Sequence, residues 1–200
     1  MKTTAVRLHG AMDLRISEFE LPDIAPDEIL MRVISDSLCA STYKAVKQGS
    51  NHKRVPPDIE ENPIIIGHEM CGEIVEVGEE RKGEWSVGQR VVIQPAQKLA
   101  SGYDPGYSYK YYGGNSLYAV IPKIAFERGC VVPYSGEGFS TAHSLSLSAV
   151  FSADLRDFTT QITRITSVPT AQRGAESSLS SAAQALWVSA QCFSEWATRV

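Results

Sequence analysis

A cysteine and a histidine-glutamate pair stand about thirty residues apart in otherwise strand-like sequence. Cys39 lies in "SLCAST", and His68 and Glu69 interrupt two apolar, β-branched runs in "NPIIIGHEMCGEIVEVGEE". Thiolate and imidazole are preferred ligands of Zn²⁺, and a catalytic zinc site takes three protein ligands and keeps a fourth position open. Glu69 would complete the set as the third ligand or exchange with another ligand of the ion. These types and spacings indicate a zinc site of Cys39, His68 and Glu69.

The glycines that flank the pair indicate how it is presented. Gly67 precedes His68 and Gly72 follows Glu69, so the backbone can turn sharply on both sides and point the two side chains away from the core. The alternative is that Cys39 is a small buried hydrophobe and that His68 is an ordinary satisfied histidine. We expect structural roles for the remaining cysteines, which show no C-x-x-C spacing and should be reduced: Cys71, Cys130 and Cys192.

The elements that position these residues are predicted to be short strands. Runs rich in β-branched residues alternate with turns containing Gly, Pro and Asp. Such runs recur about every ten residues, which favours a mainly β barrel or sandwich. The expected strands fall in residues 3–10, 14–20, 28–35, 64–67, 72–78, 88–95 and 115–122.

The segment before the last predicted strand and the C-terminal third differ from this pattern. Residues 101–114 are rich in Gly, Tyr and Ser and predict an ordered surface excursion. After about residue 139, Ser and Thr become frequent and glycine nearly vanishes, a composition typical of weakly folded sequence. Helical periodicity persists only in "SSAAQALWVSAQCFSEWA", which predicts a single amphipathic helix.

Composition and charge exclude several classes of function. The 200 residues are 43% hydrophobic and carry a net charge of −4, which suits a soluble globular protein and disfavours a broad nucleic-acid surface. No apolar run approaches the roughly 20 residues that cross a bilayer, and the N-terminus lacks the apolar core of a signal peptide. The expected location is therefore the cytoplasm, with no nucleic-acid and no membrane partner.

Three segments, in this order and at these separations, resemble a known family. "SLCAST", "PIIIGHEMCGEIVEVGE" and "VGQRVVIQP" are similar to the GroES-like catalytic domain of zinc-dependent medium-chain dehydrogenases. Within that family, "MKTTAVRLHGAMDLR" and "SDSLCAST" most resemble the L-sorbose 1-phosphate reductase group and its sugar-phosphate relatives. The resemblance implies a GroES-like β-barrel with short helices.

The resemblance also implies roles for individual residues. Cys39 and His68 become zinc ligands, Glu69 a ligand or near neighbour, and Ser41 the hydroxyl that passes the substrate proton outward. Zinc would act as a Lewis acid on the substrate oxygen while hydride moves to or from NAD(P). Lys44 occupies a place where many members carry a relay histidine, and we favour a solvated lysine.

Two departures from the family pattern lie within the predicted barrel. Ala40 and Thr42 replace a common glycine and aspartate around Ser41. The four closely spaced cysteines that bind a structural zinc are also missing, so no second zinc is expected. Stacked aromatic rings are expected to stabilise residues 101–114 instead, unless they are surface filler: Tyr103, Tyr107, Tyr109, Tyr111 and Tyr112.

The larger departure concerns residues 140–200. No glutamate-proline-leucine segment follows, and no G-x-G-x-x-G fingerprint of a Rossmann domain occurs. His143 and Asp154 are weak alternatives for a further ligand. We therefore predict a catalytic domain over residues 1–139 and an atypical tail, disordered or partly helical, that results from a truncation or a shifted reading frame.

A basic segment lies between the two halves of the predicted zinc site. His52, Lys53 and Arg54 occur in "NHKRVPP", and Arg and Lys suit a substrate phosphate. The alternative is an ordinary solvated loop.

Together these features predict the catalytic portion of a zinc-dependent, NAD(P)-linked oxidoreductase for a sugar phosphate or polyol, inactive by itself and able to form a homo-oligomer. The alternative is a non-enzymatic remnant or interaction module that pairs with an intact homologous subunit. A zinc-free quinone-reductase-like protein is a third possibility, but such proteins lack the pair of Cys39 and His68.

Overall fold

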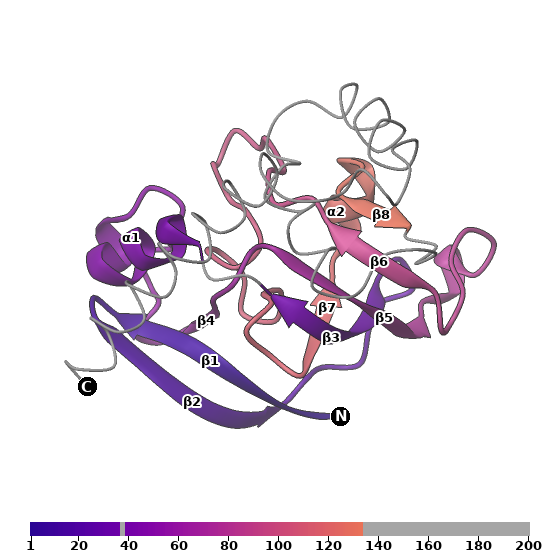
Figure 1. Ribbon diagram of the computed structural model, residues 1–200, viewed down its shortest axis with the longest axis horizontal. Coiled ribbons are helices and arrows are strands. Elements are labelled where there is room, and N and C mark those ends of the chain that lie inside the picture. Colours follow the sequence, from indigo (N-terminus) through magenta and orange to yellow (C-terminus); the bar gives the residue numbers. More distant parts are fainter. Residues whose placement is uncertain (37–38, 134–200) are drawn as a thin grey trace, which may run out of the picture.

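The computed structural model describes residues 1–36 and 39–133, and its elements are labelled in Figure 1. Two helices, two 3₁₀ turns and eight strands occur within these residues. The helices are α1 (Ala40–Gln48) and α2 (Lys123–Glu127), and the turns are η1 (Gly49–Asn51) and η2 (Glu79–Arg81). The strands are β1 (Lys2–Gly10), β2 (Asp13–Glu20), β3 (Ile29–Asp36), β4 (Ile64–Ile65), β5 (Met70–Val77), β6 (Arg90–Ile93), β7 (Tyr118–Ile121) and β8 (Val131–Pro133).

The strands form two antiparallel sheets. One has the order β2-β1-β4 and the other the order β7-β3-β5-β6-β8 (Figure 1). An isolated bridge between Ala5 and Ser116 joins β1 to the segment before β7. The prediction of a mainly β fold with short helices is confirmed.

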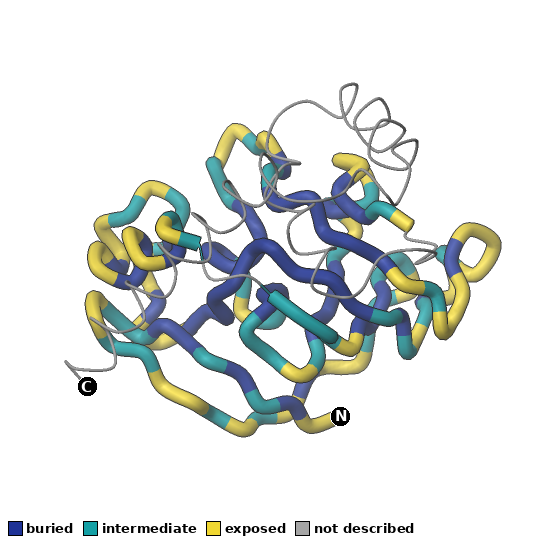
Figure 2. The backbone as a smooth tube through the Cα atoms, viewed as in Figure 1, coloured by how far each residue is buried: buried dark blue, intermediate teal, exposed yellow. Residues whose placement is uncertain are grey.

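The second sheet carries a large part of the hydrophobic core. Its middle strands are rich in fully buried apolar side chains, and Figure 2 shows the buried backbone concentrated along them. Ile29, Met31, Met70 and Ile74 are each 0% exposed on β3 and β5. On β2, in contrast, no residue is buried. Burying apolar area of this kind is the main stabilising term of folding.

A second apolar cluster holds α1 against the first sheet. Ala45 and Val46 of α1 pack with Leu8, Ile64 and Tyr107. Because Cys39 is the residue just before α1, this packing also fixes the position of Cys39.

Several predictions fall outside the described residues. These are the domain boundary at residue 139, the amphipathic helix, Cys192, and the alternative ligands His143 and Asp154. Within the described residues, no helix has the length and apolar character that crossing a membrane requires.

Candidate metal centre

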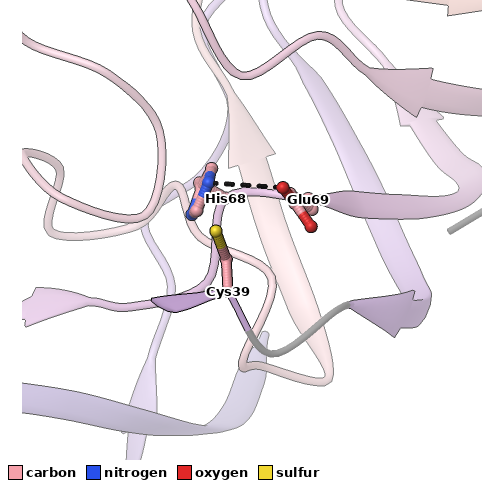
Figure 3. A group of neighbouring side chains, drawn as sticks. All are labelled: Cys39, His68 and Glu69. Carbon is pink, nitrogen blue, oxygen red and sulfur yellow. Dashed lines mark ion pairs between the residues drawn. The ribbon is translucent and has the colours of Figure 1, made fainter. Parts of the chain in front are cut away.

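The structure brings Cys39, His68 and Glu69 together (Figure 3). Cys39 precedes α1, and the other two residues lie in the loop between β4 and β5. One ligand atom from each residue, the cysteine sulfur, an imidazole nitrogen and a carboxylate oxygen, lies within 4.8 Å of the other two. Figure 3 shows the cysteine sulfur next to the imidazole, with the glutamate carboxylate to one side, 3.7 Å from His68 Nε2. The donor types and their convergence fit a zinc ion with three protein ligands.

Two glycines in contact with each other shape the loop that carries His68. Gly67 has φ +93°, and Gly106 has φ +70°, a region that residues with a Cβ rarely adopt. A Cβ on Gly106 would lie 2.1 Å from the Gly67 carbonyl oxygen. The two backbones can therefore touch only because Gly106 has no side chain, and Tyr107, the next residue, lies beside His68.

The two ligand candidates on this loop are buried. His68 is 6% exposed and Glu69 is 9% exposed. Whether they point away from the barrel core stays a prediction, but they are not open to solvent, and Ser41, Thr42 and Tyr107 lie against His68. Burial, together with the charge of Arg54, lowers the pKa of His68 to about 4, so the imidazole is neutral at physiological pH. Burial raises the pKa of Glu69, and a hydrogen bond with Cys39 partly opposes that rise.

Ser41 and Tyr107 form a chain of hydroxyl groups at the candidate metal centre. Tyr107 donates its hydroxyl proton to Ser41 Oγ at 2.7 Å, and Ser41 Oγ lies 2.8 Å from Cys39 Sγ. The Tyr107 hydroxyl also lies 3.3 Å from His68 Nε2. Tyr107 is 0% exposed, and burial raises its pKa to about 12, so it remains a proton donor. The sequence had suggested only a stacking role for this tyrosine.

Thr42 contacts the other nitrogen of the same imidazole. Its hydroxyl lies 3.2 Å from His68 Nδ1, while Nε2 faces Ser41, Tyr107 and Glu69. An Nδ1–H that donates to Thr42 leaves the Nε2 lone pair available for a metal.

We expect the substitution Thr42→Val to weaken zinc binding about 10- to 100-fold, because the hydrogen bond that fixes the imidazole is lost. Thr42→Ser keeps the hydroxyl and should bind zinc nearly as the unmodified chain does. Competition with a chromogenic chelator measures both affinities. Equal affinities for the valine and serine variants would contradict the role given to the hydroxyl.

The pH dependence of stability provides a second test of the buried imidazole. With a folded pKa of about 4 against an ordinary value of 6.5, the unfolded chain binds more protons between these two pH values. The metal-free chain should therefore lose up to about 3 kcal/mol of unfolding free energy through His68 as the pH falls from 7 to 4.

The raised pKa of Glu69 acts in the opposite direction, so the histidine contribution is isolated by comparison with His68→Asn. Urea unfolding at several pH values should show a steeper loss on acidification for the unmodified chain than for this variant. Parallel curves would mean that His68 is not buried in its neutral form.

The structure also shows where the other residues with predicted roles lie. Lys44 is exposed on α1, as expected of a solvated lysine. Cys71 and Cys130 are buried, with 5% and 1% exposure, as expected for structural cysteines. In residues 101–114, Tyr109 and Tyr112 pack with ring centroids 5.6 Å apart, so these rings are not surface filler.

The basic segment reaches the site through Arg54, whose guanidinium carbon lies 5.2 Å from the centre of the Tyr107 ring.

The fold and the donor set are those of the zinc-dependent alcohol dehydrogenase class. Residues 25–133 match the family described as the alcohol dehydrogenase GroES-like domain, and the chain belongs to this family.

Two curated relatives carry substrate names. A mannitol-1-phosphate 5-dehydrogenase of Aliivibrio fischeri is 51% identical over 141 residues, which are 70% of this chain and 33% of the relative. An L-sorbose 1-phosphate reductase of Klebsiella pneumoniae is 46% identical over 136 residues, 68% of this chain and 33% of the relative. The chain thus spans about a third of the length of these curated relatives.

A solved structure confirms the fold. The crystal structure of 2R,3R-butanediol dehydrogenase from Bacillus subtilis matches with a TM-score of 0.58 and 25% identity, covering 72% of this chain and 43% of that one.

Proposed function

We propose that residues 1–133 form the zinc- and substrate-binding part of an NAD(P)-linked oxidoreductase that acts on a sugar phosphate or polyol. The convergence of Cys39, His68 and Glu69 within 4.8 Å carries this proposal. Thiolate, imidazole and carboxylate together leave one position of a tetrahedral zinc open, as catalytic rather than structural sites do. Zinc bound there would act as a Lewis acid on the oxygen of an alcohol or carbonyl group.

The protein's own residues position and move the substrate proton. Ser41 Oγ accepts a hydrogen bond from Tyr107, which leaves the Ser41 proton free to point to the Cys39 sulfur or to a substrate oxygen. Tyr107 keeps its own proton because burial raises its pKa. Ser41 is thus the group that exchanges a proton with the substrate oxygen, and Tyr107 is the positioning residue behind it.

The hydride carrier is expected to bind outside this domain. The relatives are about three times as long as the matched segment, so most of their length lies outside the part that they share with this chain. We therefore propose that residues 1–133 alone do not turn over substrate. A reducing compartment such as the cytoplasm also stays a prediction. The homo-oligomer stays a prediction.

Cobalt substitution tests the proposed function without the hydride carrier. The 200-residue chain should bind one Co²⁺ with a sulfur-to-metal charge-transfer band and the visible bands of a four-coordinate ion. A polyol that reaches the open position should shift these visible bands, and Ser41→Ala should reduce that shift.

The matched control for Ser41→Ala is Ser116→Ala, which removes a hydroxyl that donates to the Gly113 carbonyl at 2.9 Å. It should leave the polyol response intact. A cobalt spectrum without a sulfur band, or one that no polyol or sugar phosphate alters, would support the alternative of a non-enzymatic module.

A further inference from the structure

The basic segment beside the candidate metal centre has an ordered arginine that the proposed chemistry does not use. The Arg54 guanidinium carbon lies 5.2 Å from the centre of the Tyr107 ring, and the His52 ring stacks on the same tyrosine at 5.9 Å and 14°. The hydroxyl of this tyrosine contacts Ser41 and His68. Tyr107 therefore lies between the site of the reacting oxygen, which its hydroxyl contacts, and the basic segment, which packs on its ring.

Buried groups hold Arg54 in one orientation. Its Nε lies 3.2 Å from Asp104 Oδ2, and the other oxygen of this carboxylate, Oδ1, accepts from the Gln97 amide at 2.8 Å. Asp104 is 6% exposed. The main chain is fixed as well, because the Ser108 hydroxyl donates to the Arg54 carbonyl at 2.6 Å. A guanidinium fixed in this way is preorganised to bind an anion.

Arg54 still has donors to offer. Arg54 Nε forms the ion pair with Asp104, and within residues 1–36 and 39–133 neither Nη group makes a hydrogen bond. The side chain keeps 34% of its surface exposed, and the neighbouring Lys53 is exposed. Planar Nη donors suit the oxygens of a phosphate, and the exposed ammonium adds the positive charge that Asp104 cancels on Arg54.

We propose that Arg54, assisted by Lys53, binds the phosphate ester of the substrate. This assignment rests on the proposed function and narrows its substrate to phosphorylated polyols and ketoses. The reacting oxygen then lies near the Tyr107 hydroxyl and the phosphate near the face of the Tyr107 ring, a separation that a few carbons of a polyol chain can span. A dinucleotide also carries phosphate, so the test must tell the two sources apart.

Binding to the metal-free 200-residue chain tests the subsite by itself. Calorimetric titration should detect mannitol 1-phosphate and, more weakly, inorganic phosphate, whereas unphosphorylated mannitol should not bind. Arg54→Gln should weaken binding of mannitol 1-phosphate at least about tenfold, because charge-assisted hydrogen bonds are lost. Arg54→Lys keeps the charge without the planar fork and should give an intermediate affinity.

Arg90→Gln, at an exposed arginine of β6, is the matched control and should bind as the unmodified chain does. Near-ultraviolet circular dichroism verifies that each variant is folded. Unchanged binding in folded Arg54→Gln, or no detectable binding of mannitol 1-phosphate, would overturn the proposal. Tighter Arg54-dependent binding of NADP⁺ than of mannitol 1-phosphate would assign the residue to the cofactor and overturn it too.

This outcome is independent of the metal chemistry. If the chain binds phosphate through Arg54 but its cobalt spectrum lacks the sulfur band, the phosphate subsite is supported and the proposed zinc function is contradicted. If the cobalt spectrum shows the sulfur band but Arg54 does not contribute to phosphate binding, the zinc function is supported and only the phosphate specificity is contradicted.

Discussion

Replacing Cys39 by serine should abolish tight zinc binding and lower the affinity at least about 100-fold. Cys39 supplies the only thiolate among the three convergent donors, and zinc–thiolate bonds are the strongest that this set can form. The effect should exceed that of losing the hydrogen bond from Thr42, which only orients a ligand. Chelator competition and metal analysis of the purified chain measure the loss.

Cys130→Ser is the matched control for this substitution. Cys130 is 1% exposed, and burial raises the pKa of its thiol to about 11, so it is a protonated and inaccessible sulfur. This variant should retain one zinc per chain. If Cys39→Ser retained zinc while Cys130→Ser lost it, the metal would be bound elsewhere.

Gly106→Ala should destabilise the fold by at least about 3 kcal/mol and weaken zinc binding as well. The added methyl group would lie 2.1 Å from the carbonyl oxygen of Gly67, which is main chain and cannot rotate away. Relief of this clash must move either the Gly67–His68 segment or the Tyr107 segment, and each carries a residue of the site. Urea unfolding and chelator competition measure the two effects.

Gly129→Ala separates this clash from the cost of backbone conformation. Gly129 also has a positive φ, of +64°, but nothing lies within 4 Å of the position that its Cβ would take. This control should lose only about 1–2 kcal/mol and keep its zinc affinity. Similar losses in the two alanine variants would show that the contact between Gly67 and Gly106 is unimportant.

The strands were predictable because runs rich in β-branched residues alternate with turn residues along the sequence. Each predicted run overlaps a strand of the structure, including the two-residue β4. Strand β8 was missed because its three residues give too short a pattern. The helix α1 was missed because nine residues form a marginal helix by themselves, and packing of Ala45 and Val46 stabilises this one.

The candidate metal ligands were predictable from the sequence, but the residues around them were not. Cys39, His68 and Glu69 stand out by residue type, and Ser41 by the family resemblance. Tyr107 did not stand out, because its place depends on backbone contact between two glycines that are 39 positions apart. The burial of His68 also depends on tertiary contacts with Thr42 and Tyr107, which no local pattern encodes.

X-ray absorption at the zinc edge tests the central claim most directly. For the zinc-loaded 200-residue chain we predict one sulfur at about 2.3 Å and two or three nitrogen or oxygen neighbours at about 2.0–2.2 Å. The sulfur shell should vanish in any zinc that Cys39→Ser still binds. A first shell with no sulfur, or with two or more sulfurs, would contradict a metal centre built from Cys39, His68 and Glu69.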